Sequence, residues 1–371
     1  MVLLVFVHEY NLNESNLKPW TLPNEPLTLT GFTEYFLANG LFRFRIPMLF
    51  IISGYLLSLG DTLPYKKRVK KKVKTLLYPY LIWSAFGLLL TYFFEIFDYG
   101  KSIITATSMV QIDNTRMLLH QYHWYEVLGR WIFFPVSYQL WFIRVLFIYN
   151  LAYPFLSWCV IHKTAKWILF SIAILLWIST SGFILIEGEG LLFFSLGILI
   201  QKTGFDIDVA NKWLKPKVWF VVFISFCFLK TWVAFKGYFD GVFILLLLLH
   251  KVVVFSGLIT AWFGCNWLVK YFINKRWFIH VAAFGFMIYV LHAPVVVYIN
   301  KMISLHFQHF SYYRIVSFLI VPIILVLVSI VIGYSLRKFM PRIYSAVTGN
   351  RGLQTNSIYD EAIIIKRNNN L

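Results

Sequence analysis

Five groups of ionisable side chains interrupt stretches of the sequence that are otherwise apolar. They are His8 with Glu9, Arg43 with Arg45, Arg144, His250 with Lys251, and His292. Ionisable side chains are costly in an apolar environment, so each group is a candidate for function. Imidazole can accept a proton at neutral pH, and guanidinium can stabilise negative charge that develops on an oxygen. The sequence therefore favours acid–base chemistry at a polar site inside an apolar protein.

Some of these groups also have a structural explanation. One of Arg43 and Arg45 can extend its charge to lipid head groups, whereas Arg144 lies too deep in its apolar stretch for this. His250 and Lys251 can equally form a polar pair that holds two helices together. For that pair, the structural and the functional interpretation both stay open.

Metal and disulfide chemistry have little support in the sequence. His120 and His123 have a spacing that suits two metal ligands on a helix, but no third ligand is evident. The cysteines, Cys159, Cys227 and Cys265, are far apart and form no CxxC motif. We expect neither a metal site nor a disulfide framework.

The composition requires an apolar surrounding. Of the 371 residues, 59% are hydrophobic, 20% aromatic and only 13% charged, with a mean hydropathy of +0.70. A water-soluble protein could not cover so much apolar surface, which excludes soluble enzymes and disordered chains. The net charge of +18 is therefore read as basic cytoplasmic loops that contact membrane lipids, and not as a nucleic-acid surface.

Hydropathy predicts an all-α, polytopic transmembrane bundle of about ten helices. A span needs about 20 apolar residues. The opening segment is too short to cross alone, so we expect a first helix that is truncated at its N-terminus. The other expected spans are 41–60, 75–97, 138–158, 165–186, 189–201, 217–235, 241–263, 281–300 and 314–336.

Basic residues concentrate on alternate loops and thereby predict the orientation. The segment 61–74 carries most of them, including Lys70, Lys71 and Lys72. By the positive-inside rule, both termini are cytoplasmic, and 11–38 and 98–137 lie outside. We expect 11–38 to be a turn-rich loop and 98–137 to lie on the outer interface of a plasma or inner membrane.

Four strings in this order resemble the membrane-bound acyltransferase-3 family. They are VFVHEY at the start, FRIPMLFIISGYLL at 44–57, LWFIRVLFIYNLAYPFL at 140–156 and FGFMIYVLHAPVV at 284–296. The resemblance implies a ten-helix domain, taken as 1–347, with a flexible cytoplasmic tail at 348–371. It also implies transfer of an acyl group, with acetyl expected, from cytoplasmic acyl-CoA to a hydroxyl of a cell-surface or exported glycan, free or lipid-linked.

The resemblance also implies which residues react. His8 matches the histidine of the family motif, in which an arginine precedes the histidine with ten residues between them; that arginine would precede Met1. Its role would be general base, with Glu9 orienting the imidazole and Arg45 and Arg144 stabilising the thioester oxygen. His292 is the competing base, but Ala293 and Pro294 after it also allow a structural bond to freed helix backbone. A small Ser53–Gly54 pair would permit close helix packing.

No tightly bound cofactor is expected, because the thioester of acyl-CoA is already activated. Either Lys70, Lys71 and Lys72 bind the phosphates of acyl-CoA, or they only fix the orientation of the protein in the membrane. The alternative within the same class is succinyl transfer to a periplasmic glucan. A polytopic transporter or flippase and a catalytically inactive scaffold are alternatives from other classes.

Overall fold

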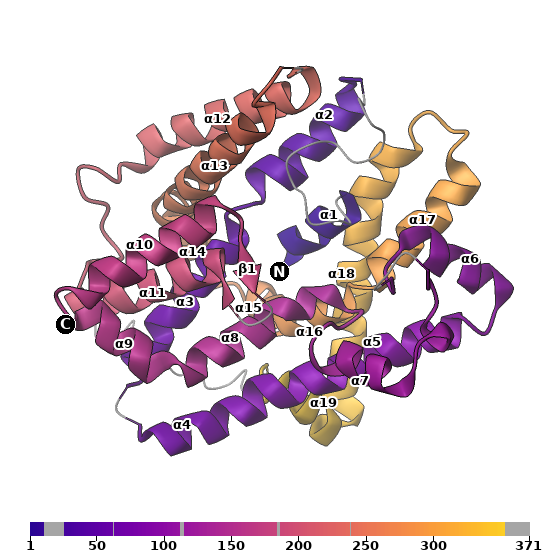
Figure 1. Cartoon of the computed structure of the whole chain (residues 1–371), viewed down its shortest axis with the longest axis horizontal. Coiled ribbons are helices and arrows are strands. Elements are labelled where there is room, and N and C mark those ends of the chain that lie inside the picture. The colour runs from indigo at the N-terminus through magenta and orange to yellow at the C-terminus, as the bar shows by residue number, and fades with distance from the viewer. Residues whose placement is uncertain (11–25, 62, 112–114, 184–185, 238, 353–371) are drawn as a thin grey trace.

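The computed structural model describes residues 1–10, 26–61, 63–111, 115–183, 186–237 and 239–352. This part of the chain is almost entirely helical, as the sequence predicts (Figure 1). Its one sheet is a short antiparallel hairpin, β1 (Gly182–Phe183) with β2 (Ile186–Glu187). The fold is therefore all-α.

The helices follow one another in this order: α1 (Val2–Tyr10), α2 (Leu29–Tyr35), η1 (Phe36–Leu41), α3 (Arg45–Leu59), α4 (Tyr65–Lys72), η2 (Val73–Leu77), α5 (Tyr78–Phe94), α6 (Asp98–Thr107), η3 (Leu119–Gln121), α7 (Trp124–Ile132), η4 (Tyr138–Leu140), α8 (Trp141–Leu151), α9 (Tyr153–Ile161), α10 (Ala165–Ile178), α11 (Gly188–Thr203), α12 (Pro216–Lys236), α13 (Val242–Gly264), α14 (Asn266–Phe272), α15 (Arg276–Ala283), α16 (Gly285–Leu291), α17 (Val295–Phe307), α18 (Tyr313–Phe339) and α19 (Pro341–Thr348).

Five continuous helical segments of the described chain are long and apolar enough to cross a membrane, and two bent helix pairs raise the number to seven. The protein is thus a multi-pass membrane protein. The expected count of about ten is not confirmed, because α1 has 9 residues, α10 has 14 and α11 has 16. A helix of this length falls short of the roughly 20 residues that a perpendicular crossing needs.

Two segments that the sequence predicts as loops are helical. Residues 29–38 belong to α2 and η1, where the Thr28 hydroxyl caps the first turn by accepting a bond from the Gly31 amide at 3.0 Å. The basic segment Tyr65–Lys72 is α4, which continues through η2 into α5. Residues 11–25 of the predicted loop 11–38 lie outside the described chain. Polar and basic helices of this kind give no hydropathy signal.

Two of the predicted spans are broken. The helix that starts at η4 bends by 67° at Ala152, and the helix that ends at Leu291 bends by 68° before Val295. Pro154 follows the first break and Pro294 lies within the second, and neither proline can donate the helical hydrogen bond. The helix irregularity expected around Ala293 is therefore confirmed.

Close packing of α3 on α11 is set by glycines. A β-carbon on Gly54 would lie 2.1 Å from the Phe194 carbonyl oxygen, and one on Gly197 would lie 2.1 Å from that of Ile51. The helices can approach this closely only because both positions lack a side chain. The packing role predicted for Gly54 is confirmed.

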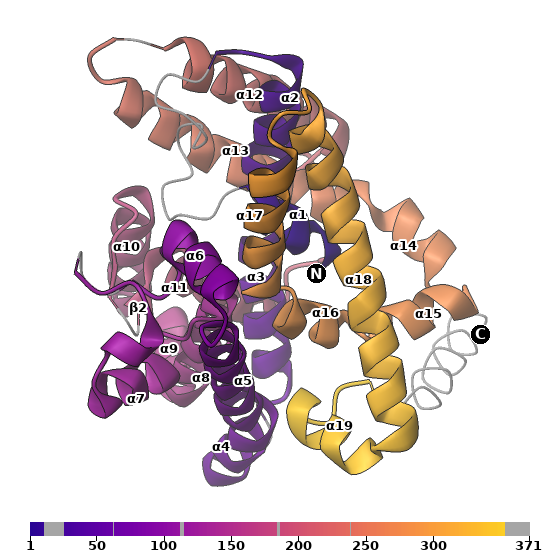
Figure 2. The same ribbon diagram turned by 90° about the vertical axis from the view of Figure 1, so that its right-hand side faces the viewer.

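Helix α1 lies inside the molecule and packs against η1, α16, α17 and α18 (Figures 1 and 2). Both figures place the basic α4 and α19 at one end of the molecule. Helix α2 and the turn between α17 and α18 lie at the opposite end. The last turn of α1 therefore lies in the interior of the molecule, between the end formed by α4 and α19 and the end formed by α2 and the α17–α18 turn.

Candidate active site

The structure brings the two candidate histidines together. His8 lies in the last turn of α1, and His292 caps α16 where that helix breaks. Their rings stack with centroids 5.2 Å apart and planes inclined by 28°. His292 is fully buried, whereas His8 is partly exposed. A substrate can therefore reach His8 more directly than His292.

Hydrogen bonds define how each imidazole can react. His292 Nδ1 lies 3.0 Å from the Ile288 carbonyl oxygen, which can only accept, so Nδ1 carries the proton. Its Nε2 thus carries the lone pair and has no hydrogen-bond partner in the described part of the chain. His8 Nδ1 lies 2.7 Å from the Tyr138 hydroxyl. The backbone bond that the sequence allows for His292 is present, yet that ring keeps a free basic nitrogen.

Gln139 braces the broken helix that carries His292. Its side-chain amide donates to the carbonyl oxygens of Val290, at 3.1 Å, and Ala293, at 3.0 Å. Tyr289 donates back to the Gln139 carbonyl oxygen at 2.5 Å. Helix breaks in a membrane protein need such partners for the freed backbone groups. The short segment of Tyr138 and Gln139 therefore positions both histidines.

Arg45 is the arginine that the structure places beside this pair. Its charge lies close enough to act on both His8 and His292. One guanidinium nitrogen donates to the Phe42 carbonyl oxygen at 2.6 Å, and Nε has no partner among the described residues. Arg144 lies instead beside Tyr80 of α5. The expectation that Arg144 assists His8 is therefore not supported by the geometry.

Glu9 does not orient His8, contrary to the expectation from sequence. Its Oε1 accepts a bond from the Ser317 hydroxyl of α18 at 2.7 Å, and its backbone oxygen accepts one from Asn300 at 2.5 Å. Consecutive residues of a helix point in different directions, so Glu9 faces α17 and α18 while His8 faces Tyr138. Glu9 is instead part of the wall of a pocket.

This polar pocket, of about 500 Å³, opens beside the last turn of α1. The side chains that line it are mostly polar or charged: Glu9, Tyr10, Glu34, Thr107, Ser108, Asn300, Lys301, Ser304, Tyr313, Arg314 and Ser317. Arg314 forms an ion pair with the buried Glu34. The pocket is lined by Glu9 and Tyr10, the two residues of α1 that follow His8, and the histidine rings themselves are not among its lining residues.

A second buried polar cluster joins η1, α12 and α13. Lys230 is 0% exposed, and its ammonium donates to the Asn39 carbonyl oxygen at 2.6 Å. It also lies 3.0 Å from His250 Nδ1, while Arg43 bonds to the Asn39 side chain. The sequence predicts His250 and Lys251 as a pair, but His250 pairs with Lys230, and Lys251 lies over the Trp177 ring at 5.0 Å.

At the basic end, α4 presents Lys70 and Lys71 to solvent and keeps Lys72 half-buried. The helix is held by Asp61, which accepts bonds from Arg68 at 2.7 Å and Lys202 at 3.0 Å. Partial burial raises the pKa of Asp61, but the bonds from these two cations outweigh it and leave the pKa below its usual range. The exposed lysines of α4 thus remain available for a ligand.

Basic charge continues from α4 towards the interior. Arg351 lies close to Lys72, and its guanidinium covers the Phe286 ring of α16 at 4.5 Å from the centroid. The first residues of the predicted tail, up to 352, are therefore packed against the bundle. The rest of the tail lies outside the described chain.

His120 and His123 each contact a different neighbouring residue. His120 Nδ1 lies 3.1 Å from Glu95, and His123 stacks on Tyr125. Within the described ranges, no group of three or more histidine, cysteine or carboxylate side chains is arranged to hold a metal ion.

Together, these features describe a multi-pass membrane protein with two stacked histidines in its interior. A family profile described as an acyltransferase domain matches residues 1–337, and the chain belongs to this acyltransferase-3 family. It is an O-acyltransferase. The succinoglycan biosynthesis protein ExoH of Rhizobium meliloti (strain 1021) is 26% identical over 332 residues, which cover 87% of this chain and 83% of that protein. No solved structure matches the chain.

Proposed function

We propose that the enzyme transfers an acyl group from cytoplasmic acyl-CoA to a hydroxyl of a cell-surface or exported glycan. The observation that carries this proposal is the stacked pair of His8 and His292 at the end of α1, the helix whose next two residues line a polar pocket. Hydroxyl and carboxylate side chains around that pocket suit a sugar. The similarity to a succinoglycan biosynthesis protein also favours a polysaccharide acceptor.

In the proposed reaction, Nε2 of His8 removes the proton of the acceptor hydroxyl as its oxygen attacks the thioester carbonyl carbon. The new C–O bond forms, and negative charge that develops on the carbonyl oxygen is stabilised by the Arg45 guanidinium. When the tetrahedral intermediate collapses, the C–S bond breaks, and the imidazolium returns the proton to the thiolate of CoA. His292 supports the ring of His8 by stacking and is the alternative base.

The donor enters from the basic end in this proposal. Lys70, Lys71 and Lys72 of α4 bind the phosphates of acyl-CoA, which is a co-substrate and not a tightly bound cofactor. Arg351 extends the positive charge towards α16. Acetyl is the proposed acyl group, with succinyl as the alternative.

This arrangement requires both termini in the cytoplasm of a plasma or inner membrane. The basic residues of α4 then lie inside, by the positive-inside rule, and α2 with the turn before α18 lies outside. In a chain without its native cysteines, a cysteine at Asn24 would react with an impermeant maleimide added outside, and a cysteine at Tyr65 would not. The reverse labelling pattern would contradict the proposed orientation.

The decisive test measures transfer of labelled acetyl from acetyl-CoA to extracted glycan by the purified protein in lipid nanodiscs. We expect His8→Ala to lower kcat by about 100-fold or more, the value of a general base. Each variant is also made with residues added before Met1, so that an arginine stands at the position that the family motif gives it. If His8→Ala keeps full turnover and His292→Ala abolishes it, the two roles are exchanged. Glycan uptake by proteoliposomes without modification would instead indicate transport.

A further inference from the structure

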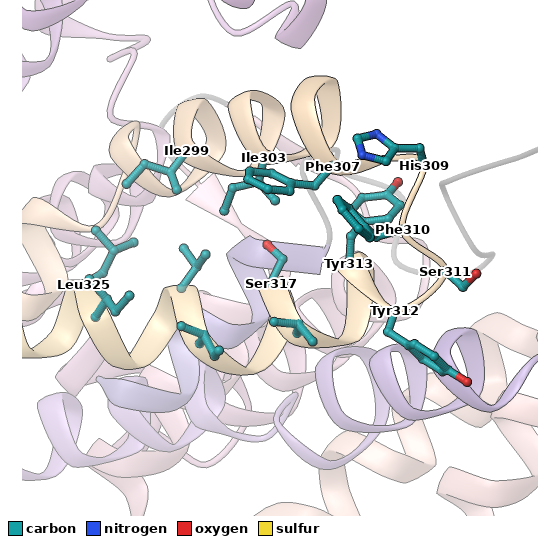
Figure 3. Close-up of a pocket in the computed structure, with 14 residues that line it drawn as sticks. Ile299, Ile303, Phe307, His309, Phe310, Ser311, Tyr312, Tyr313, Ser317 and Leu325 are labelled. Atoms are coloured by element: carbon teal, nitrogen blue, oxygen red, sulfur yellow. The ribbon is translucent and has the colours of Figure 1, made fainter.

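The polar pocket at the last turn of α1 has the size of a ligand site. Its volume of about 500 Å³ falls within the range of about 300–1,000 Å³ that is usual for ligand pockets. Tyr313 and Ser317 of α18 line this pocket and also the apolar groove between α17 and α18 (Figure 3). Because mostly aliphatic and aromatic side chains line the groove, a polar ligand is held on the pocket side of these two residues.

Glu9 offers this pocket a hydrogen-bond acceptor. Its side chain lines the pocket and is only 2% exposed. Oε1 accepts the bond from the Ser317 hydroxyl at 2.7 Å, whereas Oε2 accepts none from the part of the chain that the structure describes. Since buried acceptors in proteins are nearly always hydrogen-bonded, Oε2 suits a hydroxyl of a ligand.

Other lining residues match the two kinds of surface that a sugar has. Lys301 and Ser304 of α17 supply N–H and O–H donors for the oxygens of a sugar. Tyr10, Tyr313 and Phe318 supply ring surface for the apolar C–H face of a pyranose. A ligand that is polar at its edge and apolar on its face therefore fits this wall.

The charges around the pocket favour an uncharged ligand. Two carboxylates, Glu9 and Glu34, and two cations, Lys301 and Arg314, line it, so their formal charges cancel. Arg314 is already paired with Glu34. A site for a phosphate or another anion needs an excess of positive charge, which this wall lacks. The ligand class that the wall favours is thus a neutral sugar.

The sugar in this pocket is not the one that reacts. A general base must lie within about 2.6–3.2 Å of the group whose proton it takes, and neither His8 nor His292 lines the pocket. Glu9 follows His8 directly, with α-carbons about 3.8 Å apart. Its side chain nevertheless bonds to Ser317, whereas His8 bonds to Tyr138. The pocket and the base therefore lie on two sides of the same turn of α1.

We propose that the pocket binds a neutral sugar unit of the acceptor chain, next to the unit whose hydroxyl reacts at His8. The enzyme then recognises two linked sugars, one on each side of the last turn of α1. A single sugar fills only the reacting position, whereas a longer chain also gains the bonds to Glu9 and Lys301. This assignment rests on the proposed acyl transfer and adds a specificity site to it.

The length of the acceptor is varied in the first test. Partial hydrolysis of the extracted glycan gives single sugars and linked chains of the same composition, and both are offered to the protein in nanodiscs with labelled acetyl-CoA. We expect kcat/KM to rise about tenfold from single sugars to chains of two or more units, because bonds to a remote part of a substrate contribute to transition-state binding.

Three substitutions show whether the pocket causes this gain. Glu9→Gln and Lys301→Gln should each reduce the gain to about twofold or less, mainly by raising the KM for the chains. Lys236→Gln is the matched control, because Lys236 is exposed at the end of α12 and does not line the pocket. This variant should keep the full gain.

Lysine modification tests the place of binding without any acyl transfer. The protein in nanodiscs, without acyl-CoA, is treated with an N-hydroxysuccinimide ester of acetate, and the modified lysines are quantified by mass spectrometry. The glycan chains should slow modification of Lys301 about fivefold and leave that of Lys236 unchanged.

Three results would overturn the proposal: equal kcat/KM for single sugars and chains, a gain that survives both Glu9→Gln and Lys301→Gln, or equal modification of Lys301 with and without the chains. Protection of Lys301 in a protein that transfers no acetyl to any glycan would instead contradict the proposed function and leave the sugar site in place.

Discussion

A phenylalanine in place of Tyr138 removes one hydroxyl and the 2.7 Å hydrogen bond to His8 Nδ1, while the ring and its edge-on packing against the imidazole stay. If His8 is the general base, its ring is neutral before the reaction and positively charged near the transition state. A hydrogen bond between neutral groups is worth about 0.5–1.5 kcal/mol, and one to a charged group about 1.5–3 kcal/mol. The hydroxyl therefore stabilises the transition state by about 1 to 1.5 kcal/mol more than the ground state.

That difference predicts a fall in kcat of about five- to tenfold for Tyr138→Phe, with little change in the KM for acyl-CoA. A double-mutant cycle with His8→Gln tests whether the hydroxyl acts through His8. In the His8→Gln background, the second substitution should have no further effect on the residual rate. The assay is transfer of labelled acetyl to glycan under saturating acyl-CoA, with protein in nanodiscs.

The matched control is Tyr298→Phe. The Tyr298 hydroxyl is also buried and bonded, to Thr91 at 2.8 Å, and its ring stacks on Phe94 of α5. Loss of the Tyr298 hydroxyl should lower the melting temperature about as much as Tyr138→Phe does, and it should leave kcat unchanged. If Tyr138→Phe lowers kcat equally with and without His8, or if Tyr298→Phe has the same effect on kcat, the reasoning that links Tyr138 to the base is wrong.

Three further predictions concern other parts of the molecule. Replacing Lys70, Lys71 and Lys72 by glutamine should raise the KM for acyl-CoA about three- to tenfold, and the exposed control set Lys212, Lys215 and Lys217 should not; equal KM values would leave α4 a topological role alone. Gly54→Ala should lower the free energy of unfolding by about 1–3 kcal/mol, because its β-carbon meets the Phe194 backbone, whereas Gly129→Ala has open space and should not destabilise; equal melting temperatures would contradict the close packing of α3 on α11. Asp61→Asn should lower stability at pH 7 by about 1 kcal/mol. Because the pKa of Asp61 is lowered by Arg68 and Lys202, this difference should persist down to about pH 5 and vanish as the pH falls below about 4; a difference that grows in acid would refute it.

The long apolar helices were predictable because hydropathy is a local property. The expected spans 217–235, 241–263 and 314–336 correspond to α12, α13 and α18 within a few residues. Helices of mixed or basic composition were not predictable in this way, because α2 and α4 carry too few apolar residues to be recognised as spans. The break at Pro294 was visible in the sequence, but its 68° angle depends on what packs around it.

The candidate site was predictable only where charge interrupts apolar sequence. His8, His292 and Arg45 were identified in this way, and the structure brings them together. Tyr138 and Gln139 were missed because a tyrosine and a glutamine near a helix start resemble ordinary interface residues. The partner of Glu9 could not be inferred either, since Ser317 lies 308 positions away. Lys230 was missed although a single lysine within the apolar α12 satisfies the criterion that identified the others.

The buried Lys230 also has a consequence for how the chain enters the membrane. A lysine inside an apolar helix opposes insertion by up to about 2.5–3.5 kcal/mol, so Lys230 is the least favourable residue within α12 for entry into the lipid. Its ammonium is satisfied by the Asn39 carbonyl, which leaves the ribosome earlier, and by His250, which follows 20 residues later. Insertion of α12 is therefore coupled to η1, which is already in the membrane and accepts the lysine's hydrogen bond. It is also coupled to α13, which forms a helical hairpin with α12. Synthesis order from the N-terminus thus supplies the lysine with its first partner before α12 reaches the lipid.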